Sequence, residues 1–113
     1  MSTDECWLVT DGHVLAGAER AHGRRGRAKG LLGRDGLEGA LVIEPCRWVH
    51  TFGMRFAIDV AYLDAAGTVL KTTQMRPHRL GAPVRHAHSV VEAEAGAFHR
   101  WGLKVGDVVE LRE

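Results

Sequence analysis

Residues 50–59 of the chain read HTFGMRFAID, and this stretch decides the predicted fold. Aromatic and β-branched residues at positions 48, 49, 52 and 56 are typical of strands, and Pro45 disfavours a helix just upstream. The pattern therefore predicts that the stretch is the central strand of a small β-domain. Gly53 lies inside it, where a glycine often marks a β-bulge. A bulge would shift the register by one residue and bring His50 and Asp59 to the same face.

Turn signals on both sides of this stretch predict further short strands. The Asp11-Gly12 pair between two apolar runs predicts an N-terminal hairpin. GALVIEP, at residues 39–45, predicts a buried strand that ends at Pro45, and the turn at residues 64–67 predicts a second hairpin. Residues 76–86 are rich in Pro, Gly and basic side chains and predict a long surface loop. SVVEAE alternates as a strand does, AFHRWGL predicts one helical turn, and KVGDVVELRE predicts a closing strand.

The expected fold class follows from this order of elements. Ala28, Leu31 and Leu32 have helical spacing, so one amphipathic helix is expected near residues 24–33, ended by glycines. The fold is predicted to be mainly β (α+β): a small closed or partly closed β-barrel of about seven strands, with one short helix in the N-terminal half. With 113 residues, the chain is expected to form a single domain over residues 1–113.

Composition narrows the class of protein further. The formal net charge is +1, with 15 basic and 14 acidic side chains, so no global charge favours nucleic acid or an acidic membrane. No apolar run approaches the roughly 18 residues that span a bilayer. Asp4 and Glu5 stand where a signal peptide would have basic residues, and a cytoplasmic protein is therefore expected. Cys6 and Cys46 are expected to be reduced thiols in that compartment.

Two residue sets resemble metal ligands, but neither is predicted to bind a metal. Cys46, His50 and Met54 would lie about 13 Å apart along a strand, too far to hold one ion. His78, His86 and His88 lie in or beside the 76–86 loop, where exposed histidines are the commoner explanation than a metal site. No metal and no cofactor is therefore expected.

The strongest charge asymmetry lies in the segment from Arg20 to Arg34, which contains six cations and follows a single acid, Glu19. Such a segment could contact phosphates. No aromatic residues alternate with the cations there to stack on bases, so a solvated helix face is favoured and nucleic acid is not expected as a partner.

Four motifs in this order resemble a known family. They are Ala-x-Gly-Leu-x-x-Arg at residues 28–34, the segment ending at Asp59, the run 92–96 and the run 102–107. Their order and spacing over about residues 8–112 are similar to the domain of unknown function 192 family of bacteria and archaea. The resemblance implies a compact β-rich domain with a short helix that carries the first motif, and it implies no established reaction. Ala57 and Leu32 replace the proline and methionine that family members often have there, and both changes are conservative for packing.

Two functions remain open from the sequence. The first is a non-catalytic accessory domain that binds a small ligand or a partner in a polar pocket formed by Arg34, His50, Arg55 and Asp59. A small anionic or polar ligand would suit this pocket, because Arg34 can hold an anionic group in a bidentate contact. No membrane partner is expected, and the chain is expected to be a monomer or a weak homodimer.

The alternative is a small hydrolase or lyase. His50 would act as the general base because its ordinary pKa lies near neutrality. Asp59 would orient His50, and Arg34 or Arg55 would stabilise developing negative charge. Cys46 could be a nucleophile only beside a group that lowers the pKa of its thiol. The sequence alone does not decide between binding and catalysis.

Overall fold

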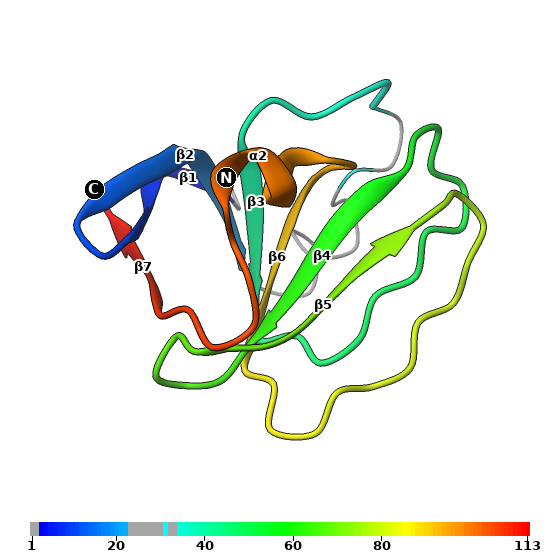
Figure 1. Cartoon of the computed structure of the whole chain (residues 1–113). Coiled ribbons are helices and arrows are strands. Elements are labelled where there is room, and N and C mark those ends of the chain that lie inside the picture. The colour runs from blue at the N-terminus through cyan, green and yellow to red at the C-terminus, as the bar shows by residue number, and fades with distance from the viewer. Residues whose placement is uncertain (1–2, 23–30, 32–33) are drawn as a thin grey trace.

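The computed structural model describes residues 3–22, 31 and 34–113 of the chain. Within these residues the fold is mainly β, as predicted: seven strands form one sheet, and the helix α2 follows the sixth strand (Figure 1). The elements are β1 (Thr3–Thr10), β2 (His13–His22), β3 (Ala40–Glu44), β4 (Ile58–Leu63), β5 (Val69–Met75), β6 (Ser89–Glu94), α2 (Ala97–Trp101) and β7 (Val109–Arg112).

The strand order in the sheet is β5-β4-β6-β3-β2-β1-β7. Every neighbouring pair is antiparallel except β2 and β3, which run parallel. The sheet curls so that its two end strands approach each other (Figure 1). An isolated bridge pairs Thr68 with Val108, and the Val109 N–H donates to the Gly67 carbonyl at 2.9 Å. The strands β5 and β7 do not pair along their length, so the barrel is partly closed.

The predicted hairpins form where the turn residues placed them. Asp11 and Gly12 both have positive φ angles, 50° and 74°, as a two-residue turn between twisted strands requires. Asp64 organises the second hairpin: its Oδ1 accepts the N–H groups of Ala66 and Thr68 at 3.0 and 2.9 Å. The local turn chemistry therefore sets both hairpins.

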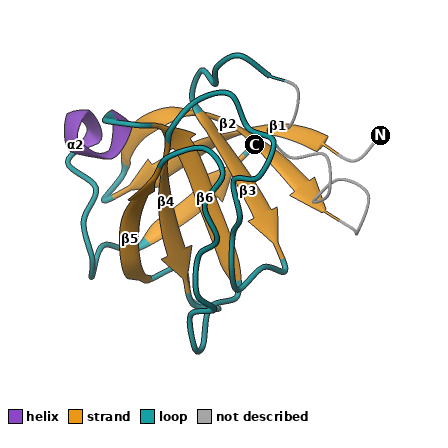
Figure 2. Ribbon diagram, turned by 90° about the vertical axis from the view of Figure 1, so that its right-hand side faces the viewer, coloured by secondary structure: helices purple, strands orange, loops and turns teal. Residues whose placement is uncertain are grey.

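Each face of the sheet has its own core. The inner face of the curled sheet packs small and branched side chains from β1, β2, β3, β4 and β6 around Phe98 of α2 and Leu103. The outer face of β3, β4 and β6 is covered by residues 45–57 and 76–88, which run across it in Figure 2. Val49, Met54 and Ala87 from these two loops are buried in this second core. Both loops are therefore part of the packed structure.

The prediction of a central strand over residues 50–59 was wrong in its first part. Only the end of the stretch belongs to β4, which begins at Ile58, and residues 45–57 form a loop apart from one bridge at His50. Gly53 has a φ of 79°, and the Met54 N–H donates to the Thr51 carbonyl at 3.1 Å. The chain thus turns at Gly53, so this glycine does not mark a bulge in a continuous strand.

The helical turn expected in AFHRWGL is α2. The helix predicted near residues 24–33 falls on positions that lie, except for Leu31, outside the described residues. Among the residues that the structure describes, no helix has the length and apolar character needed to cross a membrane.

Candidate functional site

Asp59 anchors the helix α2 to the strand β4. Its Oδ2 accepts the N–H groups of Gly96 and Phe98, both at 3.0 Å, and its Oδ1 accepts the Gln74 side-chain amide at 3.2 Å. Gly96 is the N-cap residue of α2 and has no side chain to cap the helix. A carboxylate from a distant strand therefore does the work of a capping residue, and both of its oxygens are engaged.

The two arginines of the predicted pocket each have a different carboxylate partner. Arg34 Nη1 lies 3.0 Å from Glu19 Oε2, and Arg55 Nη1 lies 2.9 Å from Asp35 Oδ1. The Arg55 and Asp35 side chains are 60% and 86% exposed, so their pair is screened by water and contributes little to stability.

His50 lies on the surface in a row of aromatic rings. Its ring centroid is 5.7 Å from that of Trp48 and 5.3 Å from that of Phe52, and the Phe52 N–H donates to His50 Nδ1 at 3.3 Å. Trp48 and Phe52 are about half exposed. Alternate residues of this segment point outward, and Val49 and Thr51 between them are buried.

In the part of the chain that the structure describes, Arg34, His50, Arg55 and Asp59 each contact a different partner, and His50 and Asp59 lie on different segments. The physical reason is the turn at Gly53: it ends the extended segment that carries His50 before β4 begins. Among the described residues, His50 and Asp59 have separate hydrogen-bond partners, and the hydrogen bonds of Asp59 go to α2 and Gln74.

Residues 45–57 and 76–88, here called the loop pair, are joined by backbone hydrogen bonds. The Val84 N–H donates to the Arg47 carbonyl at 2.8 Å, the Gly81 N–H to the Val49 carbonyl at 2.9 Å, and the His78 N–H to the Thr51 carbonyl at 2.8 Å. His50 and Leu80 form an antiparallel bridge between the two segments. The loop pair is thus an irregular antiparallel ribbon laid over the second core.

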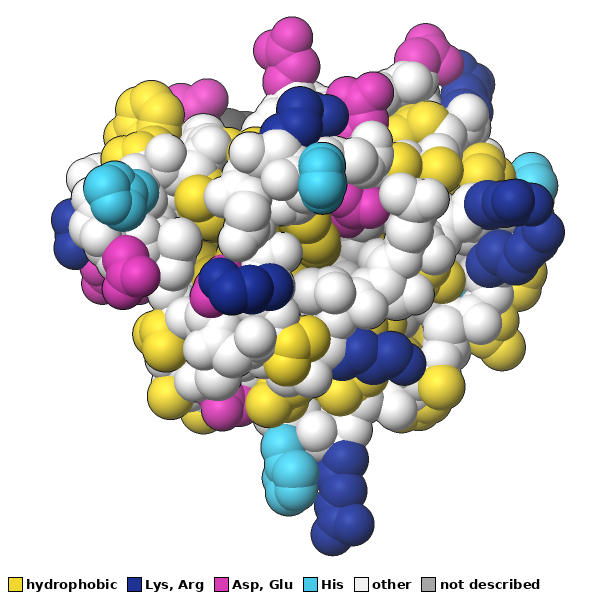
Figure 3. Space-filling view, in the orientation of Figure 1, with side chains coloured by type: hydrophobic (Ala, Val, Ile, Leu, Met, Phe, Trp, Pro, Cys, Tyr) yellow, Lys and Arg dark blue, Asp and Glu magenta, His cyan; other side chains and the backbone are white. Residues whose placement is uncertain are grey.

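The loop pair is strongly basic. Its 26 residues include five Arg and four His and no Asp or Glu. With neutral histidines it carries +5, while the other 87 residues carry −4 and give the chain its net charge of +1. Figure 3 shows Lys and Arg at the right-hand edge and at the bottom of the molecule, where the loop after β5 runs in Figure 1.

One cavity lies between this loop and the edge strand β5. Its volume is about 380 Å³. Lys71, Arg76 and Arg79 contribute the charged side chains of its lining, which contains no acidic residue. Tyr62, Thr73, Gln74, Met75, Leu80, Gly81 and Ala82 complete the wall. The cavity is therefore suited to an anion.

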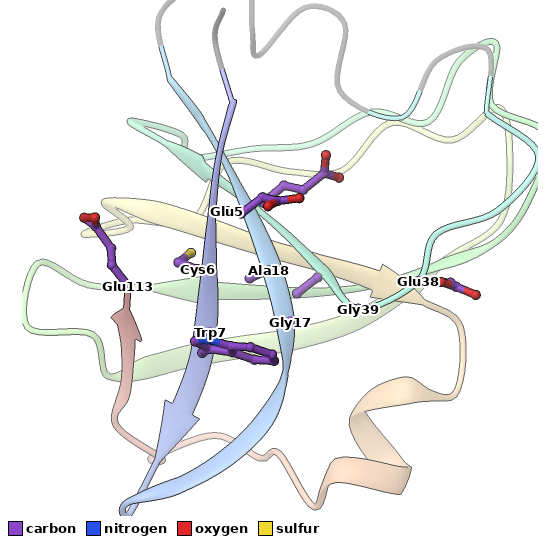
Figure 4. Close-up of a pocket in the computed structure, with 10 residues that line it drawn as sticks. Glu5, Cys6, Trp7, Gly17, Ala18, Glu38, Gly39 and Glu113 are labelled. Atoms are coloured by element: carbon purple, nitrogen blue, oxygen red, sulfur yellow. The ribbon is translucent and has the colours of Figure 1, made fainter.

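A larger cavity, about 610 Å³, lies along β1, β2 and the start of β3 (Figure 4). Its charged lining is acidic: Glu5, Glu19, Glu38 and Glu113. Trp7 is 53% exposed, and a Cβ built on Gly17 would lie 3.8 Å from its ring. The two cavities thus differ in the sign of their charge.

A carboxyl group is buried in the second core. Glu92 is 4% exposed and pairs across the sheet with Leu41 and Val60. Burial raises the pKa of the Glu92 carboxyl from 4.5 to about 7. Burial also raises the pKa of the Tyr62 phenol, and negative charge on Cys46 and Glu92 raises it further. Glu92 is therefore the described acid whose ionisation is most sensitive to the fold.

The described residues contain no group of three His, Cys, Asp or Glu side chains arranged to hold a metal ion. Cys46 Sγ donates to the Trp48 carbonyl at 3.2 Å, Met54 is buried in the second core, and His50 is exposed. These three side chains therefore have different surroundings. His78 Nδ1 accepts the Gly53 N–H at 3.3 Å, which is a contact within the loop pair.

The sequence analysis assigned no role to Thr51, Lys71, Arg76 or Arg79, and it noted Glu92 only as the start of a family motif. The absence of every Asp and Glu from residues 45–57 and 76–88 was a readable signal for the basic face. No local pattern indicates that these two segments pair or that Glu92 lies beneath them, because both facts depend on contacts distant in sequence.

Fold and surface together define a small, partly closed β-barrel with a basic ribbon across its outer face. A family model described as "DUF192: Uncharacterized ACR" matches residues 7–111. The chain belongs to the DUF192 family, which confirms the resemblance read from the four sequence motifs.

Two curated relatives come from Pyrococcus species. A UPF0127 protein of Pyrococcus abyssi (strain GE5 / Orsay) is 39% identical over 62 residues, which are 55% of this chain and 53% of the relative. A UPF0127 protein of Pyrococcus furiosus is 37% identical over 62 residues, with the same coverage. The match thus spans about half the length of these relatives.

Two crystal structures share the fold. A protein of unknown function from Novosphingobium aromaticivorans DSM 12444 superposes with a TM-score of 0.79 and 20% identity, covering 96% of this chain and 84% of that chain. A proposed transcription regulator from Sinorhizobium meliloti 1021 superposes with a TM-score of 0.83 and 20% identity, covering 98% of this chain and 96% of that chain. At this identity the likeness shows the fold alone.

Proposed function

We propose that this protein is a non-catalytic accessory domain that binds a small anionic or polar ligand, or a partner that presents such a group, on the loop pair. The observation that supports it is the charge of the loop pair. Its 26 residues carry +5 and are held side by side by backbone hydrogen bonds, while the other residues of the chain carry a net negative charge. A basic surface of this kind attracts anions and raises their local concentration.

Two of the four predicted site residues, His50 and Arg55, belong to the loop pair. The row Trp48, His50 and Phe52 adds exposed aromatic surface beside the cations. Large exposed apolar side chains close together are typical of interaction sites. Arg34 and Asp59 would support binding indirectly, through their contacts with Glu19 and with α2.

Backbone amide NMR tests the proposal. The labelled protein is titrated with a set of small carboxylates, phosphates and neutral polar compounds, and amide shifts are mapped on the fold. Shifts concentrated in residues 45–57 and 76–88 would support the proposal. The Lys104→Gln variant is the control in the same titration, because it removes a cation outside the loop pair. Lys104 already has a carboxylate partner, Asp107, at 3.2 Å, so its loss should leave the shifts in the loop pair unchanged. An absence of shifts with every compound, or shifts confined to the acidic cavity along β1 and β2, would refute it.

A further inference from the structure

We propose that the cavity between β5 and residues 79–82 binds the phosphate group of a small phosphorylated molecule. This inference rests on the proposed ligand-binding function and names its site and ligand class. The cavity holds about 380 Å³, within the range of small-molecule sites.

The charge of the lining is the first argument. Lys71, Arg76 and Arg79 come from the strand β5, from the residue after it and from the following loop. Elsewhere in the described chain, Arg34, Arg55 and Lys104 each have a carboxylate oxygen within 3.2 Å. The ion pairs found among described residues include none for the three cations of the cavity. Within the same residues, Arg79 Nη1 donates only to the Pro77 and His78 carbonyls, both at the long distance of 3.4 Å. Three neighbouring cations without an acid repel one another, and a dianion relieves that repulsion.

The chemistry of these side chains favours phosphate. The planar guanidinium forks of two arginines match the paired oxygens of a phosphate, and a lysine adds a point charge. A phosphate monoester carries close to two negative charges near neutral pH, whereas a single carboxylate carries one. The hydroxyl of Thr73 is a further donor in the lining.

The backbone on which the two arginines sit is held in place from beneath. The Thr51 side chain is fully buried, and its hydroxyl donates to the Arg76 carbonyl and accepts the Arg79 N–H at 2.8 Å. One side chain thus fixes the backbone of both arginines before a ligand arrives. Such preorganisation lowers the entropy lost on binding.

The apolar part of the lining indicates the rest of the ligand. Met75, Leu80 and Ala82 line the cavity beside the cations. A phosphate attached to a small ring or short carbon chain would bury its apolar part against these residues. We therefore expect an organic phosphate to bind more tightly than inorganic phosphate.

A small molecule fits better than a strand of nucleic acid. The exposed aromatic rings of the loop pair belong to residues 48–52, and no residue of 45–57 lines the cavity. The ring of Tyr62 in the cavity wall is buried. The His50 and Phe52 rings stack on each other, with a centroid distance of 5.3 Å and an interplanar angle of 28°. A strand would need ring faces free for its bases beside the phosphate contacts.

Calorimetric titration with phenyl phosphate, inorganic phosphate and benzoate, in a buffer free of other oxyanions, tests the inference. Phenyl phosphate is expected to bind most tightly and benzoate most weakly. Arg76→Gln and Arg79→Gln are each expected to weaken phenyl phosphate binding about tenfold or more, because each removes a charge-assisted hydrogen bond. Arg85→Gln is the matched control: it removes an exposed arginine of the same loop that does not line the cavity, and we expect a change below about twofold.

Lys71→Gln tests the third cation from the strand side and is also expected to weaken binding. Equal losses for Arg85→Gln and Arg79→Gln would overturn the site, since they would show only a general effect of charge. If other compounds shift the loop pair in the NMR titration and phenyl phosphate does not bind, this inference fails and the proposed function stands. If no compound binds, both fail. Binding of a single-stranded oligonucleotide without binding of phenyl phosphate would overturn the inference in favour of nucleic acid.

Discussion

Thr51 and Arg79 hold each other through reciprocal hydrogen bonds: the Thr51 N–H donates to the Arg79 carbonyl at 2.8 Å, and the Arg79 N–H donates to Thr51 Oγ1 at 2.8 Å. The same hydroxyl donates to the Arg76 carbonyl. Because Thr51 is fully buried, water cannot replace these bonds when the hydroxyl is removed. Thr51 is therefore one of the residues that join the two segments of the loop pair, and it does so through both its backbone and its side chain.

Replacing Thr51 by valine keeps the shape of the side chain and removes the hydroxyl. The Arg79 N–H and the Arg76 carbonyl then lose a partner, and we expect the free energy of unfolding to fall by about 2–3 kcal/mol. Urea denaturation measures this loss. Thr51→Ser is the control, since it keeps the hydroxyl and loses one methyl group, for which about 1 kcal/mol is expected. Equal losses in the two variants would show that the hydroxyl has no special role.

Asp59 is expected to stabilise α2, so its replacement tests a structural role for a residue predicted from sequence to bind a ligand. Asp59→Ala leaves the N–H groups of Gly96 and Phe98 without their acceptor, and we expect a loss of about 2–4 kcal/mol in the free energy of unfolding. Hydrogen exchange should also become faster at Phe98. Gln74→Ala removes a single contact of the same carboxylate and should cost about 1 kcal/mol. A stable Asp59→Ala protein with unchanged exchange in α2 would contradict this role.

Sequence reasoning succeeded where local chemistry decides the structure. The Asp11-Gly12 turn, the turn at residues 64–67 and the helical turn in AFHRWGL each depend on a few neighbouring residues, and all three were predicted. It was wrong about residues 50–57, because aromatic and β-branched side chains suit a half-buried extended loop as well as they suit a strand. The parallel pairing of β2 with β3 also had no local signal.

The contacts of the predicted site residues had no local signal either. Arg55 and Asp59 are near neighbours in sequence, yet their side chains contact Asp35 and α2. Lys71 and Arg79 meet at one cavity because the chain folds back after β5. Residue types can be read from sequence, whereas their convergence depends on contacts between distant segments.

Gly67 is required for the closure of the barrel. Its φ is 89°, and a Cβ at this position would lie 2.3 Å from the Val109 carbonyl oxygen. Gly67→Ala therefore combines backbone strain with a clash against β7, and we expect a loss of about 3–5 kcal/mol in the free energy of unfolding. Gly12→Ala is the matched control. Gly12 also has a positive φ, 74°, but no atom lies within 4 Å of its Cβ position, so a loss of about 1–2 kcal/mol is expected. Similar losses at the two positions would mean that the contact between the ends of the sheet contributes nothing.

Glu92 should make the stability of the protein depend on pH. Burial raises the pKa of its carboxyl from 4.5 to about 7, so the folded state holds the proton more tightly than the unfolded state. The stability that this proton contributes is fully present below pH 4.5 and is lost as the pH rises to about 7. The difference corresponds to roughly 3 kcal/mol, at 1.36 kcal/mol for each pKa unit.

Glu92→Gln removes the ionisation and keeps the size of the side chain. We expect this variant to match the natural protein in stability near pH 4 and to be more stable by about 3 kcal/mol at pH 8. At pH 8 the natural protein must either bury the ionised Glu92 carboxylate or hold its proton against the solvent, and the glutamine does neither. Urea denaturation in a series of buffers from pH 4 to 8 measures both curves. The control is Glu94→Gln, which removes an exposed carboxylate from the same strand and reports the effect of one surface charge. A constant difference between Glu92→Gln and the natural protein across this range would show that the Glu92 pKa is not raised by burial.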